Sequence, residues 1–188
     1  SVATTGVASA TSLTVGTSSS ATGAVVLQAG SRTSHDLSLA SALTAGGSVL
    51  LQAAGALNIN ADLSAVNLSG LAGLGLSLGA GADLAVSSTA DLSAANGSLT
   101  MAADATVTAT GNARLAAVGD ISLGLVTANQ VSLLATGLIS DAHTAGDTTL
   151  NVVGSALRVL LVPSGAQPVG HFAIALQPSN PAEVCLAL

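Results

Sequence analysis

The chain has 188 residues, of which 49% are hydrophobic and only 6% are charged, with a mean hydropathy of +0.73 and a formal net charge of −6. Nine acids oppose three arginines, so nucleic acid is not expected as a partner. Its longest apolar runs fall far short of the roughly 18 residues of a membrane helix, so we expect no membrane insertion of this segment.

Residues 1–162 contain no proline, lysine, cysteine, Phe, Tyr or Trp. They consist of short runs of Val, Leu, Ile and Ala separated by Gly, Asp, Asn and Ser. Because globular cores normally use aromatic side chains to fill irregular space, this composition predicts an interior of stacked aliphatic layers. Such layers are typical of a solenoid.

A recurring segment supports the solenoid. It occurs at 23–29, 47–53, 97–103, 119–125 and 146–152, with Gly70 in the third place, at intervals of 24, 23, 27, 22 and 27 residues. This spacing predicts an all-β fold, a right-handed parallel β-helix with three sides and about six coils of 22–27 residues. The leucines at the shared position should stack along one inner wall: Leu27, Leu51, Leu99, Leu123 and Leu150.

Apolar residues alternate inside each interval, as in 57–59, 74–78, 107–109 and 121–125. A period of two predicts strands with one buried face. Aspartates precede strands at Asp62, Asp83, Asp91 and Asp120, where short carboxylates accept hydrogen bonds from nearby backbone amides at tight corners.

The composition changes at Pro163. All four prolines lie in residues 163–188, as do Phe172, Glu183 and Cys185. We therefore divide the chain into a solenoid domain, 1–162, and a C-terminal cap or tail, 163–188. The stretch 169–176 resembles a strand pair, which favours a cap that covers the open edge of the last coil, and a disordered tail is the alternative.

The run 119–142 combines Gly-Asp, an alternating strand, a Thr-Ala-Asn corner, a second alternating strand and Gly-Leu-Ile-Ser-Asp. It resembles the repeats of filamentous-haemagglutinin-like exoproteins and autotransporter adhesins. The resemblance implies a β-helical adhesin shaft on a bacterial cell surface, secreted through an outer-membrane partner or through a barrel of its own. For such a shaft we expect any binding to host glycans, matrix or sister fibres to be modest and spread over a strand face.

Three groups of polar residues are candidate chemical sites. Ser34, His35 and Asp36 are the residue types of a catalytic triad, but neighbours on a strand point to opposite faces. Asp141 and His143, with Asp147 nearby, have a spacing that permits a metal site, although a solvated corner fits them better. His171 has no acidic neighbour and is expected on the surface or in the cap. We expect no enzyme activity, no cofactor and no metal.

Other functions remain as alternatives. A surface-layer or biofilm-matrix protein shares this composition, but the chain lacks complete calcium-binding nonapeptides. The run 106–110 resembles one rung of an ice-binding threonine ladder, and 61–70 matches two pentapeptide repeats whose register then ends. A polysaccharide-active β-helix enzyme needs clustered carboxylates, whereas these acids are spread one per corner.

Overall fold

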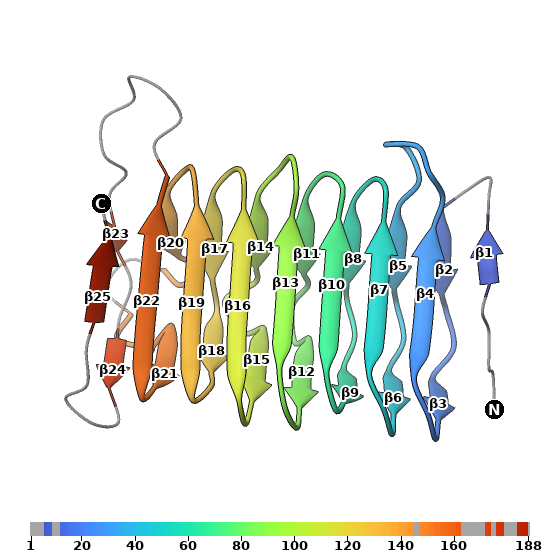
Figure 1. The fold of residues 1–188 in the computed structure, drawn as a ribbon, viewed down its shortest axis with the longest axis horizontal. Helices are drawn as coiled ribbons and strands as arrows, with labels where there is room; N and C mark the ends of the chain where they lie inside the picture. Colours follow the sequence, from blue (N-terminus) through green and yellow to red (C-terminus); the bar gives the residue numbers. More distant parts are fainter. Residues whose placement is uncertain are drawn as a thin grey trace.

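The computed structural model describes residues 6–8, 12–144, 147–162, 172–173, 176–178 and 184–187, with side chains in 12–144 and 147–162. Every regular element in these ranges is a β-strand, and the strands form three parallel sheets stacked as a three-sided solenoid of about seven turns. In Figure 1 the chain ascends the near sheet, descends through the two sheets behind it and advances from right to left, which is a right-handed coil. The predicted fold class is confirmed, with about seven turns where about six coils were expected.

Each turn contributes one strand to each sheet, and the sheets are here named A, B and C. Sheet A contains β1 (Gly6–Ala8), β4 (Val25–Ala29), β7 (Val49–Ala53), β10 (Leu68–Ala72), β13 (Ala90–Ala94), β16 (Asn112–Ala117), β19 (Gln130–Ala135), β22 (Ala156–Leu161) and β25 (Val184–Ala187).

Sheets B and C are built from shorter strands. Sheet B contains β2 (Leu13–Val15), β5 (Leu37–Leu39), β8 (Leu57–Ile59), β11 (Leu76–Leu78), β14 (Leu99–Met101), β17 (Ile121–Leu123), β20 (Ile139–Asp141) and β23 (Phe172–Ala173). Sheet C contains β3 (Ser19–Ala21), β6 (Leu43–Ala45), β9 (Leu63–Ala65), β12 (Asp83–Val86), β15 (Thr106–Ala109), β18 (Leu125–Thr127), β21 (Val152–Gly154) and β24 (Leu176–Pro178).

The core consists of columns, meaning residues in register at one position of successive strands. In sheet B one inward column is almost completely buried: Leu37, Leu57, Leu76, Leu99, Ile121 and Ile139. Successive strands lie about 4.8 Å apart, so each aliphatic side chain packs on a similar one above and below. In residues 12–144 and 147–162, near-identical layers fill this interior without aromatic residues, as the composition predicted.

The predicted single wall of leucines is wrong. Leu27 and Leu51 stack in sheet A, whereas Leu99 and Leu123 lie in sheet B and Leu150 precedes β21. The cause is the uneven length of the turns: hydrogen-bonded neighbours in successive turns are 24, 19, 22, 23, 18 and 26 residues apart. The predicted range of 22–27 residues was too narrow, so similar segments fall on different sheets.

The corner aspartates bond along the solenoid axis. Asp62 Oδ1 accepts a hydrogen bond from the amide of Asp83 at 3.2 Å, and Asp120 Oδ1 accepts one from the amide of Leu138 at 2.7 Å. Asp83 accepts a hydrogen bond from the Thr106 hydroxyl. Each of these bonds joins a corner to the next turn. Asp91 was expected before a strand but lies within β13.

The strands β23, β24 and β25 each pair with the last strand before them, one in each sheet. The division at residues 162 and 163 remains a prediction. Within the predicted strand pair 169–176, the described residues are Phe172 and Ala173 of β23 and Leu176 of β24. His171 lies outside the described residues.

Candidate functional site

The outward columns of sheets B and C carry small polar side chains. In sheet B the column comprises Thr14, Ser38, Asn58, Ser77, Thr100, Ser122 and Ser140. In sheet C it comprises Ser20, Thr44, Ser64, Thr108 and Thr127, and the apolar Ala85 interrupts it between Ser64 and Thr108. The single predicted threonine rung at 106–110 is therefore part of a longer column, and a second column of the same chemistry runs along sheet B.

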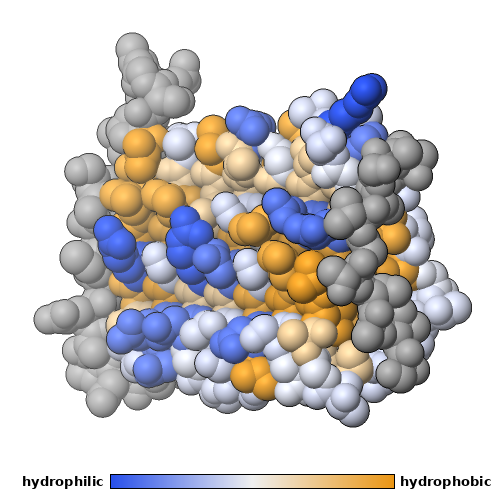
Figure 2. All heavy atoms as spheres, turned by 45° about the vertical axis from the view of Figure 1, so that its right-hand side comes forward, coloured by the Kyte–Doolittle hydropathy of each residue, from blue (hydrophilic) through white to orange (hydrophobic). Residues whose placement is uncertain are grey.

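Sheet A has a wider outer face, because its central strands are five or six residues long and present two outward columns. The first column is Val26, Leu50, Ser69, Asp91, Arg114, Ser132 and Arg158. The second column is Gln28, Gln52, Leu71, Ser93, Ala116, Leu134 and Leu160. Figure 2 shows hydrophobic bands running beside rows of strongly hydrophilic side chains on this part of the surface.

The charged part of the first column is the most distinctive chemistry on the outer surface. Arg114 Nη1 donates to Asp91 Oδ1 at 2.8 Å, and both side chains are nearly half exposed. Arg158 is exposed two strands further along and forms no ion pair within residues 12–144 and 147–162. A groove of about 510 Å³ runs past Arg114, Ser132 and Arg158.

The apolar end of the same column lines a second groove. It has a volume of about 470 Å³, and Val26, Leu50 and Ser69 lie along it. The outer face of sheet A thus changes along the solenoid axis from apolar to acidic to basic. Sequence analysis missed this face, although the alternation in the five-residue strands and the Asp91–Arg114 separation of one turn were visible signals.

The candidate triad is not assembled. The His35 ring is buried against Gly30, and its Nδ1 accepts a hydrogen bond from the Arg32 amide at 3.4 Å. Asp36 Oδ1 instead accepts one from the Ala56 amide of the next turn at 2.7 Å. Gly30 has a φ of +43°, and a Cβ there would lie 1.7 Å from His35 Nδ1. These residues therefore shape a corner.

The second candidate pair is joined to a residue that sequence analysis missed. Asp141 Oδ1 lies 2.6 Å from His143 Nδ1 and accepts hydrogen bonds from the amide of His143 and from Nδ2 of Asn151, both at 2.8 Å. Asn151 is fully buried, and its Nδ2 also lies 2.8 Å from the Leu123 carbonyl and 3.2 Å from the Gly124 carbonyl. The cluster fastens the chain between β20 and β21 onto the turn before it.

Hydrogen bonding controls the acidity of this cluster. Burial alone would raise the pKa of Asp141, but the hydrogen bonds from Asn151 and His143 outweigh it and lower that pKa. Hydrogen bonds from the hydroxyl and amide of Thr149 lower the pKa of Asp147. Asp147 is exposed, as expected for a solvated corner, whereas the His143 side chain is only 8% exposed.

The cluster does not have the composition of a metal centre. Within the described residues, no three His, Cys, Asp or Glu side chains converge on one point. The Asp141 oxygen and the His143 nitrogen that face each other are already joined, and the third member of the cluster is an amide. Asp141, His143 and Asn151 therefore join two successive turns, and we call this cluster the latch.

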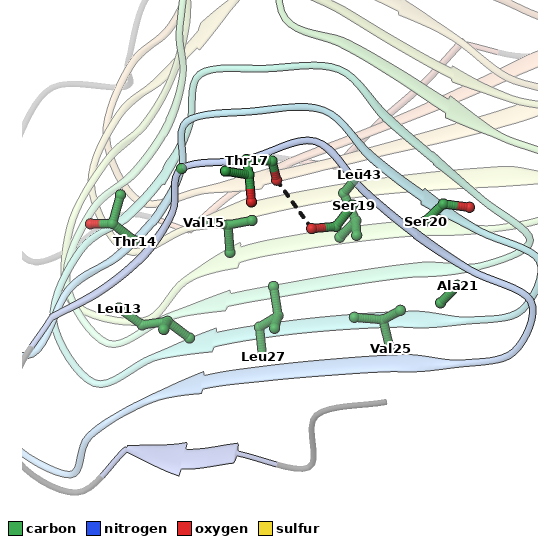
Figure 3. Close-up of a pocket in the computed structure, with 11 residues that line it drawn as sticks. Leu13, Thr14, Val15, Thr17, Ser19, Ser20, Ala21, Val25, Leu27 and Leu43 are labelled. Atoms are coloured by element: carbon green, nitrogen blue, oxygen red, sulfur yellow. Dashed lines mark hydrogen bonds between the residues drawn. The ribbon is translucent and has the colours of Figure 1, made fainter. Parts of the chain in front are cut away.

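A third groove, of about 240 Å³, lies at the N-terminal end of the core. Figure 3 shows the side chains of Leu13, Val15, Val25, Leu27 and Leu43 around it, with Ser19 Oγ donating to the Thr17 carbonyl at its rim. Among the described residues, sheets B and C begin here at β2 and β3. The groove thus lies where the described inward columns of sheets B and C begin.

Comparisons with models of protein families, with curated protein sequences and with solved structures find no match to this chain. Among the described residues there is also no helix long and apolar enough to cross a membrane.

Proposed function

We propose that this chain is a non-catalytic shaft and contact segment of a secreted bacterial surface adhesin. The observation that carries the proposal is the set of three parallel ladders, which run through every described turn and leave the outer columns free. Each turn is bonded directly to the next, so a stack of this kind resists bending and holds its ends at a fixed separation.

The resemblance of residues 119–142 to the adhesin repeats adds support. This run covers the strands from β17 to β20, where Gly119 and Asp120 form a corner and Asp120 bonds to the next turn. The Gly-Asp pair of the repeat therefore has a physical role, since its carboxylate joins consecutive turns. Secretion through an outer-membrane partner and a place on the cell surface belong to the same proposal.

The hydrogen bonds of four aspartates support the non-catalytic proposal over the enzyme alternative. A polysaccharide hydrolase needs two carboxylates that face one bond, at a separation of about 5 to 10 Å. Here the Asp36, Asp62 and Asp120 carboxylates each accept an amide hydrogen bond between turns, and Asp91 pairs with Arg114. These four acids hold successive turns together.

The test places residues 1–188 between a surface anchor and a distal adhesive domain on a bacterium that does not otherwise attach. The matched control replaces the segment by a Gly/Ser linker of equal residue number, which behaves as a flexible coil. We expect the solenoid to support attachment under flow severalfold better than the linker. Equal attachment with the linker, or glycan cleavage by the segment alone, would contradict the proposal.

The hydroxyl columns of sheets B and C favour a second candidate, an ice-binding surface. Seven outward polar side chains of sheet B stand in register at a spacing of about 4.8 Å, so water molecules bound between them would repeat at the same interval. Thermal hysteresis of the purified segment measures this activity. Activity that is lost in Thr100→Leu and kept in Ser93→Leu on sheet A would favour ice binding over the shaft.

A further inference from the structure

We propose that the outer face of sheet A is a self-association surface, on which two copies of this chain pack face to face with their solenoid axes antiparallel. Only the two outward columns of sheet A form this surface, and it does not require the shaft role. Along the first column, Asp91, Arg114, Ser132 and Arg158 occupy four successive strands. This order is complementary to itself when it is reversed.

A two-fold axis parallel to the strands produces that reversal. Such an axis turns the solenoid direction around but keeps each column opposite itself, as an isologous interface requires. With the axis between Arg114 and Ser132, Asp91 of each copy faces Arg158 of the other, and Arg114 faces Ser132. Two intermolecular ion pairs and two polar contacts result.

The charged groups are available for these contacts. Asp91 uses Oδ1 for Arg114, and its second carboxylate oxygen can accept from another guanidinium. Arg158 is exposed and has no ion pair within residues 12–144 and 147–162. Since the chain carries only three arginines and a net charge of −6, two of them in one outward column form an exceptional basic site.

The second column supplies the apolar part of the interface. In the same arrangement Ser93 of each copy faces Leu160 of the other, and Leu134 covers the already buried Ala116, so that two partly exposed leucines of each copy become covered. Six overlapping strands, from β10 to β25, span roughly 29 Å by 18 Å. The total buried area of about 1,000 Å² is at the lower limit for specific association, so we expect a reversible dimer that weakens in high salt.

The experiment reverses the charge of each partner of the proposed ion pair in a separate variant. Arg158→Asp places like charges opposite each other at both ends of the homodimer, and Asp91→Arg does the same with the opposite sign. Each variant alone should dimerise at least about tenfold more weakly than the wild type. An equimolar mixture should recover association, because both ion pairs are restored in the mixed dimer. Sedimentation equilibrium of the 188-residue chain measures all three cases.

Arg32→Asp is the matched control, since it makes the same charge change at an exposed turn away from sheet A. We expect its association to equal that of the wild type, and circular dichroism verifies that every variant is folded. A wild-type chain that stays monomeric at high concentration would overturn the proposal. So would a dimer that Arg158→Asp leaves intact, or two variants that fail to recover on mixing.

Discussion

The inner and outer faces of the three sheets differ in how regularly the same residue types recur from one turn to the next. The inward columns are the same on every side, with Leu, Ile, Val or Ala at almost every position, and most of these residues are less than 5% exposed. The outward columns differ from sheet to sheet: sheets B and C present hydroxyl groups, and sheet A presents charge beside an apolar band. The inner faces therefore determine the fold. The outer face of sheet A differs most from the repeating pattern, because it combines charged and apolar side chains.

Removing an inward leucine should cause the largest loss of stability. Leu84 is fully buried between Leu63 and Val107 in sheet C, so Leu84→Ala leaves a cavity and should cost about 3 kcal/mol of unfolding free energy. Thr108→Ala, an exposed change in the next strand of the same sheet, should cost less than about 0.5 kcal/mol. Urea unfolding measures both, and similar losses would refute the distinction between the faces.

Asn151 tests a polar residue that behaves as part of the interior. Asn151→Ala leaves the buried carbonyls of Leu123 and Gly124 with fewer donors and should cost about 2 kcal/mol. Asn151→Asp should cost more, because its carboxylate would face that of Asp141. Thermal unfolding ranks the two variants, and an equal or smaller loss for Asn151→Asp would show that the latch is misassigned.

Gly70 tests how tightly the inner columns are packed. It replaces a leucine in the inward column of sheet A, between Leu51 and Leu92, and a Cβ there would lie 2.7 Å from Leu92 Cδ2. Gly70→Ala should therefore cost about 1 to 2 kcal/mol through overpacking. Combined with Leu92→Val, which removes part of the obstructing side chain, the loss should be less than additive. A double-mutant cycle with strictly additive losses would contradict this packing.

The smallest effect concerns acid stability. The folded pKa of Asp141 is lowered, so the stabilisation it supplies is present above its unfolded pKa of about 3.9 and is lost as the pH falls through the folded value. Asp141→Asn should flatten the dependence of unfolding free energy on pH below about pH 4. Asp104→Asn, at an exposed turn, serves as the control. Unfolding midpoints between pH 2 and pH 6 measure how steeply stability depends on pH. The same dependence in Asp141→Asn and in the wild type would contradict the role of Asp141.

Local patterns predicted the strands well, because alternation depends only on neighbouring residues. The run 121–125 shows the limit: it reads as one strand but forms β17 and β18 on two sheets, with a corner at Gly124. A Cβ at Gly124 would lie 2.4 Å from the Ala105 carbonyl oxygen, so the corner depends on contact with the preceding turn. The column positions of Leu99 and the Asp91–Arg158 array depend in the same way on turn lengths, which no local pattern determines.

The distance between two outward positions of sheet B tests the rigid stack most directly. Thr14 and Ser140 lie six strands apart in one column, which places their backbones about 29 Å apart. Spin labels on Thr14→Cys and Ser140→Cys, in a chain carrying Cys185→Ser, allow pulsed dipolar spectroscopy to measure this separation. We expect a single narrow distribution centred near 29 Å, broadened only by the label linkers. A broad distribution, or a centre displaced by the height of two or more turns, would contradict a continuous rigid shaft.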